Sequence, residues 1–230
     1  MITKNLLFKN FIGKKNLKKN EVLLNILKKE NWLKKFPLLN SLTEQYKYSF
    51  TKKKIIQLKK FSSYNLIGMG GSVLGAEAIY DFLRDKIKKK FKFFNNLNSK
   101  NILNKEKNKL NIIISKSGNT LETISNLNLL LQKQSKNKSI FITEKKNNYL
   151  TLIANKLRSE ILEHKNFIGG RYSVLSEAGM LPAALMGLDE RKFKKYNELI
   201  INKSFINYLI NNVNYIKKYI DEGKKNSVIL

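Results

Sequence analysis

The sequence contains no cysteine, and this absence excludes several classes of chemistry. Without cysteine there is no disulfide framework and no thiolate nucleophile, a composition that fits a reducing compartment. Histidine occurs once, at His164, so neither a cluster of metal ligands nor a Ser/His/Asp triad is indicated. A lone histidine between Glu163 and Lys165 is more often a solvated residue, and we expect it on the surface. We therefore predict no metal site and no cofactor.

The sequence also lacks any apolar run of the roughly 20 residues that a membrane-spanning helix needs. Its N-terminal segment, Met1–Asn20, mixes lysines with apolar residues. This segment has neither a continuous apolar core nor a small-residue cleavage site, so it does not have the pattern of a secretory signal. We expect a chain with no membrane partner and a cytoplasmic location.

Negative charge is scarce, with 17 acidic residues against 45 Lys and Arg and a net charge of +28. Clustered basic residues are typical of nucleic-acid binding. Here, however, lysines are spread along the whole chain among asparagines and isoleucines, all of which AT-rich codons encode. Arginine, which recognises bases and phosphates through paired hydrogen bonds, occurs only at Arg84, Arg158, Arg171 and Arg191. We interpret the charge as compositional bias and predict no nucleic-acid partner.

What is present indicates a globular α/β fold. Hydrophobic residues make up 42% of the 230 residues, which is enough for a packed core. Short apolar runs alternate with amphipathic helical patterns, which predicts an open parallel sheet with helices on both faces. The expected strands are 64–69, 91–94, 111–114 and 139–143, and the expected helices are 73–87, 121–131, 147–157 and 173–188, the last interrupted by Pro182.

Helical patterns also flank this region. An amphipathic helix is predicted over 21–34, a less clearly bounded one over 41–58, and lysine-rich helices over 191–223. Residues 227–230 resemble the opening of a further strand, so we expect the chain to stop where another sheet would begin. The expected organisation is an N-terminal helical extension at 1–60, an α/β domain at 61–190 and a helical connector at 191–230.

A glycine-rich turn, Gly68–Ser72, separates the first expected strand from its helix. Glycines let the backbone approach an anion closely, and a helix N-terminus supplies free N–H groups. The dinucleotide fingerprint G-x-G-x-x-G is absent, because Val73 stands where its last glycine belongs. The alternative is a tight structural turn in which Ser72 caps the helix.

A second loop, Ser115–Thr120, also follows a strand and precedes a helix. Its hydroxyl groups, its backbone N–H groups and the Lys116 ammonium match the oxygens and charge of a phosphate monoester. The alternative is a plain helix cap, which needs only one of these hydroxyls. Both loops are expected at the carboxyl ends of parallel strands, where open α/β sheets bind ligands.

A third segment, Gly169–Ser173, presents Arg171 after a pair of glycines. A guanidinium placed there is suited to stabilising negative charge that develops on a substrate oxygen. The alternative is an ordinary surface arginine, which is less expected in a chain that rarely uses arginine.

Together the three segments resemble the glucose-6-phosphate isomerase family. Leu66–Gly75 is similar to the family's first sugar-phosphate loop, Ile114–Thr123 to its phosphate loop and Phe167–Ser176 to its Gly-Gly-Arg segment. Their order and spacing agree, and the resemblance covers about 63–189. It implies a sugar-isomerase (SIS) domain at 61–190, built as a parallel-sheet three-layer sandwich. It also implies interconversion of glucose 6-phosphate and fructose 6-phosphate, an aldose–ketose isomerisation of glycolysis and gluconeogenesis.

The same resemblance implies roles for particular residues. Arg171 would stabilise the cis-enediolate intermediate, and a homodimer is implied as a possible assembly. The implied substrate contacts are phosphate contacts from Ser115, Lys116, Ser117 and Thr120 and sugar contacts from Gly71 and Ser72.

The family's base glutamate, ring-opening histidine and late lysine belong to segments that have no counterpart in this sequence. Glu122, just after the phosphate loop, is a secondary candidate for the base, with local hydrogen bonding as its other interpretation. We therefore expect a truncated isomerase. A non-catalytic SIS regulatory module that binds sugar phosphates is the alternative, and a degenerate chain that folds poorly is a third.

Overall fold

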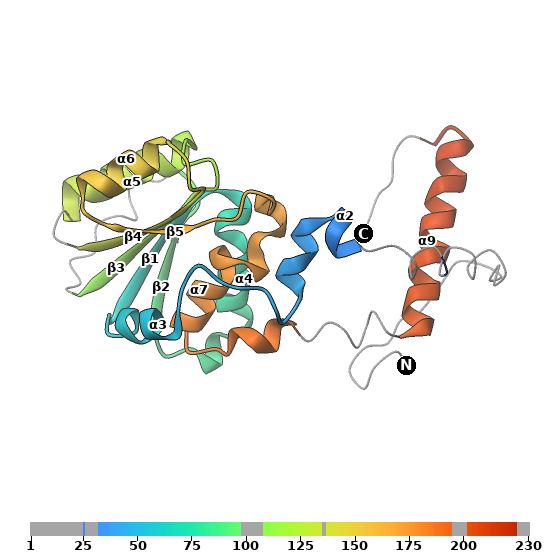
Figure 1. Ribbon diagram of the computed structural model, residues 1–230, viewed down its shortest axis with the longest axis horizontal. Coiled ribbons are helices and arrows are strands. Elements are labelled where there is room, and N and C mark those ends of the chain that lie inside the picture. The colour runs from blue at the N-terminus through green and yellow to red at the C-terminus, as the bar shows by residue number, and fades with distance from the viewer. Residues whose placement is uncertain (1–24, 26–31, 98–107, 135–136, 195–201, 225–230) are drawn as a thin grey trace. The chain divides into compact units, whose positions relative to one another are not determined.

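The computed structural model describes residues 25, 32–97, 108–134, 137–194 and 202–224 (Figure 1). The chain divides into two compact units. One unit comprises 36–194 and holds the whole sheet. The other comprises 1–35 together with 195–230, and its described helices are α2 (Trp32–Lys35) and α9 (Lys203–Asp221).

The sheet has five parallel strands in the order β2-β1-β3-β4-β5. Every residue of the two central strands β1 and β3 is buried, because helices cover both faces of the sheet. For this reason β1 and β3 contain apolar runs rather than alternating patterns. The strands are β1 (Ser63–Gly68), β2 (Lys90–Phe94), β3 (Lys109–Ile114), β4 (Lys138–Thr143) and β5 (Glu160–Glu163).

Helices form a layer on each side of the sheet (Figure 1). One face is covered by α3 (Lys52–Leu58), α4 (Leu74–Phe82) and α7 (Glu177–Leu185). The other is covered by α5 (Leu121–Gln134) and α6 (Tyr149–Lys156). The predicted parallel three-layer sandwich is therefore confirmed.

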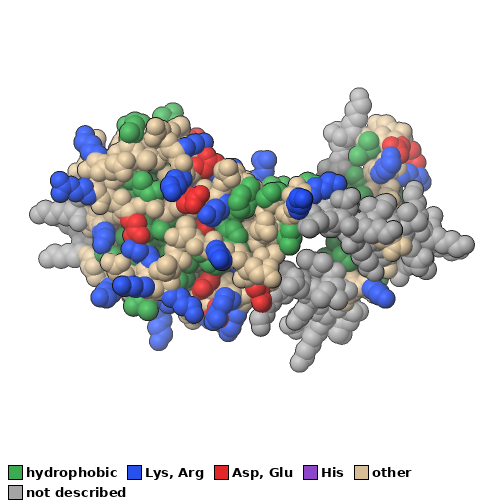
Figure 2. Space-filling view, viewed as in Figure 1, with side chains coloured by type: hydrophobic (Ala, Val, Ile, Leu, Met, Phe, Trp, Pro, Cys, Tyr) green, Lys and Arg blue, Asp and Glu red, His purple; other side chains and the backbone are tan. Residues whose placement is uncertain are grey.

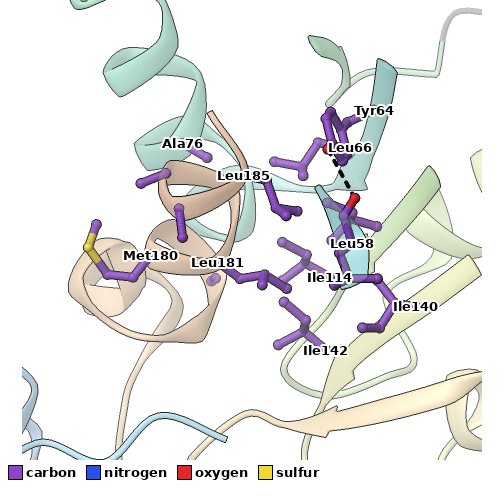
Figure 3. Close-up of a cluster of buried hydrophobic side chains, with 14 of the residues drawn as sticks. Leu58, Tyr64, Leu66, Ala76, Ile114, Ile140, Ile142, Met180, Leu181 and Leu185 are labelled. Carbon is purple, nitrogen blue, oxygen red and sulfur yellow. Dashed lines mark hydrogen bonds between the residues drawn. The ribbon is translucent and has the colours of Figure 1, made fainter. Parts of the chain in front are cut away.

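The larger core lies between the sheet and α7 (Figure 3). Ile114 and Ile142 of the strands point toward Leu181 and Leu185 of α7, and all four side chains are buried. Because every residue of α7 is buried, tertiary packing holds this helix together and it continues past Pro182. The proline expected to interrupt the helix therefore does not end it.

Several elements differ in length from the expected ones. The helix expected over 73–87 ends at Phe82 and is followed by a short 3-10 turn, η3 (Arg84–Lys86). The helix expected over 41–58 is η1 (Pro37–Leu42), then an irregular stretch, then α3. α3 begins where it does because the Thr51 side chain accepts a hydrogen bond from the Lys54 amide.

Strand β5 is missing from our sequence expectation. It is four residues long and lies at the edge of the sheet, where Glu160 and Glu163 flank two apolar residues. A short edge strand with charged ends carries no continuous apolar run, so the criterion that identifies the central strands fails here.

The expected domain boundaries at 60 and 190 stay a prediction. In the structure, residues 36–58 belong to the same compact unit as the sheet, as does η6 (Glu190–Lys194). The helix expected over 21–34 lies almost wholly outside the described residues, and the strand expected at 227–230 lies outside them entirely.

The surface of the sheet-bearing unit is rich in lysine. Figure 2 shows Lys and Arg side chains distributed over the visible face, with Asp and Glu among them, rather than gathered in one patch. No helix within the described residues is both long enough and apolar enough to cross a lipid bilayer.

Candidate functional site

The three segments that the sequence singles out each follow a strand of the sheet. The pairing of β1 with β3 sets Gly68 opposite Ile114, so the Gly68–Ser72 and Ser115–Thr120 loops leave the same edge side by side. The third segment, η5 (Gly170–Leu175), comes after β5. Because the strands are parallel, all three leave from the carboxyl edge, where ligands bind in such sheets.

The Ser115–Thr120 loop is folded around its own hydroxyl groups. The Ser115 and Thr120 hydroxyl oxygens are 2.9 Å apart, and Ser115 Oγ accepts a hydrogen bond from the Gly118 amide at 3.2 Å. Gly118 has φ +69°, a conformation that glycine adopts without strain. The loop thus brings hydroxyl groups together immediately before the first turn of α5. A plain helix cap would use only one hydroxyl group, whereas this loop places the Ser115 and Thr120 hydroxyl groups next to each other.

The end of β4 and the start of α6 hold the Ser115–Thr120 loop in place. The Gly118 carbonyl accepts from the Leu150 amide at 3.0 Å, and the Lys116 carbonyl accepts from the Thr143 hydroxyl at 3.3 Å. Asn148 lies so close to Gly118 that a Cβ there would be 2.0 Å from the Asn148 Oδ1. These contacts fix the loop before any ligand arrives, and sequence reasoning did not identify the supporting residues Thr143 and Asn148.

The Lys116 ammonium lies 3.6 Å from the Glu144 carboxylate, which also pairs with Lys146. The hydrogen bond from Lys146 is the main cause that lowers the pKa of Glu144, against the effect of burial, so this carboxylate is ionised at neutral pH. An anion entering the loop therefore competes with Glu144 for Lys116.

The glycine-rich turn is docked against η5. A Cβ on Gly71 would lie 2.0 Å from the Gly170 carbonyl oxygen, a distance that no side chain tolerates. The buried Ser173 hydroxyl is 2.8 Å from the Gly71 carbonyl and 2.7 Å from the Gly170 carbonyl, so one donor links the two segments. Ser72 is buried and does not cap α4, whose N-cap residue is Val73. The helix-cap interpretation of Ser72 is therefore wrong.

Arg171 and Glu122 are the other two site residues that the sequence suggests. Arg171 is exposed at the start of η5, and its guanidinium makes no ion pair or hydrogen bond with the part of the chain that is described. Glu122 is half-buried in the first turn of α5. Arg171 lies at the start of η5 and Glu122 at the start of α5. Within the described residues no hydrogen bond or ion pair joins the two side chains.

His164 corrects our expectation of a surface histidine, because only 1% of it is exposed. It directly follows β5, where side chains alternate between faces, and Leu162 two residues earlier belongs to the core under α7. Glu163 and Lys165 pair with each other at 2.9 Å. Burial is the main cause that lowers the pKa of His164. The alternation of β5 would have indicated this burial, had the strand been recognised.

Chemically, the site offers hydroxyl donors, backbone N–H groups at a helix start, an ammonium and an exposed guanidinium. This set suits a phosphate and a developing oxyanion. In the described ranges, no group of three or more His, Asp and Glu side chains lies together in a way that would hold a metal ion.

Comparison with known proteins decides the family. The family model for phosphoglucose isomerase matches residues 19–213, which is most of the chain. The chain belongs to the phosphoglucose isomerase family. The three segments that carry the resemblance all fall inside the matched range.

Curated members of the phosphoglucose isomerase family match parts of the chain. Glucose-6-phosphate isomerase of Mycoplasma genitalium is 35% identical over 168 residues, covering 64% of this chain and 39% of that protein. The enzyme of the same name from Methanocaldococcus jannaschii is 32% identical over 195 residues, covering 75% of this chain and 48% of that protein. The chain thus spans less than half the length of these relatives.

A hypothetical protein from Thermus thermophilus has a similar structure, with a TM-score of 0.64, 20% identity and coverage of 88% of this chain and 52% of that one. At this identity the likeness shows the fold alone.

The link through Ser173 gives a first prediction. Ser173→Ala should destabilise the chain by about 1–3 kcal/mol, because the part-buried Gly71 and Gly170 carbonyls lose the one hydroxyl proton that they share. It should also weaken binding of fructose 6-phosphate, the ligand proposed below, because the Gly68–Ser72 loop is no longer tied to η5. Urea unfolding and calorimetric titration measure the two effects.

Ser176→Ala is the matched control for this prediction. Its buried hydroxyl donates only to the Ser173 carbonyl at 2.7 Å, within the same segment. This variant should lose stability and keep affinity. Equal affinities of the two variants would show that Ser173 does not position the loop.

Proposed function

We propose that the Ser115–Thr120 loop binds the phosphate of a sugar phosphate, and that the chain serves the interconversion of glucose 6-phosphate and fructose 6-phosphate. The observation that carries this proposal is the loop itself, with hydroxyl groups 2.9 Å apart beside Lys116 at a helix start. The names of the curated relatives support the choice of reaction.

The other site residues complete the proposed pocket. Ser115, Lys116, Ser117 and Thr120 hold the phosphate, and Gly71 and Ser72 line the sugar. Arg171 acts on the cis-enediolate, whose oxygen gains negative charge as a proton moves between C2 and C1. Since its guanidinium has no partner in the described residues, Arg171 is available for that charge. We further propose a homodimer in the cytoplasm, as the family resemblance implies.

The proton transfer needs a carboxylate within hydrogen-bond reach of both carbons. Glu122 is the candidate base that this chain offers, because it lies in the first turn of the helix after the phosphate loop. Phosphate binding without such a base supplies affinity and little rate.

A non-catalytic sugar-phosphate-binding module is the second candidate function. It is favoured by the composition of the site segments: 68–72, 115–120 and 169–173 contain no acidic residue. A coupled isomerase assay on the 230-residue chain separates the two candidates. Turnover that Glu122→Gln abolishes supports the enzyme, whereas tight binding without turnover supports the module.

The test of the phosphate site is a calorimetric titration with fructose 6-phosphate. The double variant Lys116→Ala, Thr120→Ala should bind at least about 100-fold more weakly than the wild type, because a charge-assisted and a neutral hydrogen bond are both lost. Lys145→Ala, which removes a neighbouring lysine outside the loop, should leave the affinity within about twofold. Unchanged affinity in the double variant would refute the site.

A further inference from the structure

His164 is buried beside the phosphate loop and has no role in the site described above. Its amide donates to the Thr143 carbonyl at 2.8 Å, and the Thr143 hydroxyl donates to the Lys116 carbonyl at 3.3 Å. Two hydrogen bonds therefore connect the histidine backbone to the loop that we assign to phosphate. The imidazole lies inside the protein at this point, with 1% of the residue exposed.

The ring has one nitrogen free to take a proton. Nδ1 lies 3.2 Å from the Lys165 carbonyl oxygen, which only accepts, so Nδ1 carries the hydrogen of the neutral ring. Nε2 then holds the lone pair. It is buried without a hydrogen-bond partner anywhere in the described residues. A proton on Nε2 would thus disturb no existing hydrogen bond.

Charged groups from three segments act electrostatically on the imidazole. Glu177 comes from α7, Lys116 from the phosphate loop and Glu144 from the turn after β4. Burial is the largest cause that lowers the pKa of His164, and Lys116 lowers it further, whereas the Lys165 carbonyl, Glu177 and Glu144 raise it. On either side of His164 in the sequence, Glu163 and Lys165 neutralise each other in an ion pair.

Glu177 is suited to stabilise an added positive charge. It is fully buried, with one oxygen accepting from the Tyr46 hydroxyl at 2.8 Å and the other from the Ser49 amide at 3.0 Å. A carboxylate oxygen can accept more than one hydrogen bond, so each Glu177 oxygen can still accept another. Among these groups Lys116 belongs to the phosphate loop, so its positive charge is the one that a bound anion offsets.

We propose that His164 takes up a proton from solvent at Nε2 when a dianion occupies the Ser115–Thr120 loop. This inference rests on the proposed phosphate site. The dianion offsets the Lys116 charge and adds negative charge nearby, and both changes favour the imidazolium. By linkage, protonation of His164 strengthens dianion binding to the same extent. The site consequently holds dianions more tightly as the pH falls through the titration of His164.

The chain has a single histidine, so an untagged sample gives one imidazole Cε1–H signal by proton NMR. The probe is sulfate, a dianion that does not itself titrate near neutral pH, compared with chloride at matched ionic strength. Saturating sulfate should raise the midpoint of the His164 titration by about one pH unit, which corresponds to about tenfold tighter binding to the protonated chain. Fructose 6-phosphate should shift it in the same direction.

Two variants serve as controls. In Lys116→Ala, sulfate should leave the midpoint unchanged because the anion no longer binds. In His164→Asn, whose amide can still donate to the Lys165 carbonyl, sulfate affinity measured by calorimetry should no longer rise as the pH falls. A midpoint shift that persists in Lys116→Ala would overturn the inference, since the anion would then act from another place.

The titration separates failure of this inference from failure of the proposed function. Binding of sulfate or fructose 6-phosphate with an unmoved His164 midpoint refutes proton uptake and leaves the phosphate site standing. A folded chain that binds neither anion refutes the proposed function, and the inference with it.

Discussion

Gly71→Ala is expected to destabilise the chain by about 2–4 kcal/mol and to remove measurable fructose 6-phosphate binding. The added Cβ would lie 2.0 Å from the Gly170 carbonyl oxygen. Because the clash is with backbone, no side-chain rotation relieves it, and the glycine-rich turn must move away from η5. That movement also breaks the Ser173 hydrogen bond to the Gly71 carbonyl and separates the glycine-rich turn from Arg171.

Gly170→Ala is the matched control on the other side of the same contact. A Cβ at Gly170 meets no atom within 4 Å, so this variant should stay within about 1 kcal/mol of the wild type and keep its affinity. Urea midpoints and calorimetric titration measure both quantities. If the two alanine variants behaved alike, the close docking of the turn on η5 would be wrong.

Glu177→Ala should have the largest effect on folding, a loss of about 3–5 kcal/mol in the free energy of unfolding. The buried carboxylate accepts from the Tyr46 hydroxyl and the Ser49 amide, and alanine leaves both part-buried donors without this acceptor. Lys194 is buried beside them, with its ammonium 4.6 Å and 4.5 Å from the Tyr46 and Tyr48 ring centroids. Loss of the carboxylate thus leaves a buried cation with less compensation.

Graded variants test the same network. Glu177→Gln keeps one oxygen acceptor and should cost less than alanine, and Tyr46→Phe removes one hydrogen bond and should cost about 1–2 kcal/mol. Chemical denaturation gives the order. A Glu177→Ala chain as stable as the Tyr46→Phe chain would show that the carboxylate does not anchor this segment to α7.

Whether a strand could be predicted from the sequence depends on how deeply that strand is buried. β1, β3 and β4 have helices on both faces, so their residues form apolar runs that stand out in the sequence. β5 lies at the edge, is short and ends in glutamates, and it was not predicted. The position of His164 was mistaken for the same reason, since its burial follows from the alternation of that strand.

The site shows a similar division. The Ser115–Thr120 loop could be predicted because its hydroxyls, its glycine and Lys116 are neighbours in sequence. The docking of Gly71 on Gly170 could not, because the Ser173 hydrogen bond that marks it joins residues 102 positions apart. The contacts of Glu177 with Tyr46 and Ser49 span 131 and 128 positions, and no local pattern encodes them.

A crystal structure of the chain with fructose 6-phosphate tests the central claim most directly. The account predicts the phosphate within hydrogen-bond distance of the Ser115 and Thr120 hydroxyls, with the sugar directed toward Gly71 and Arg171. A competing location exists in the open pocket lined by Lys145, Lys146 and Lys165. Phosphate density in that pocket, with the Ser115–Thr120 loop empty, would contradict the account.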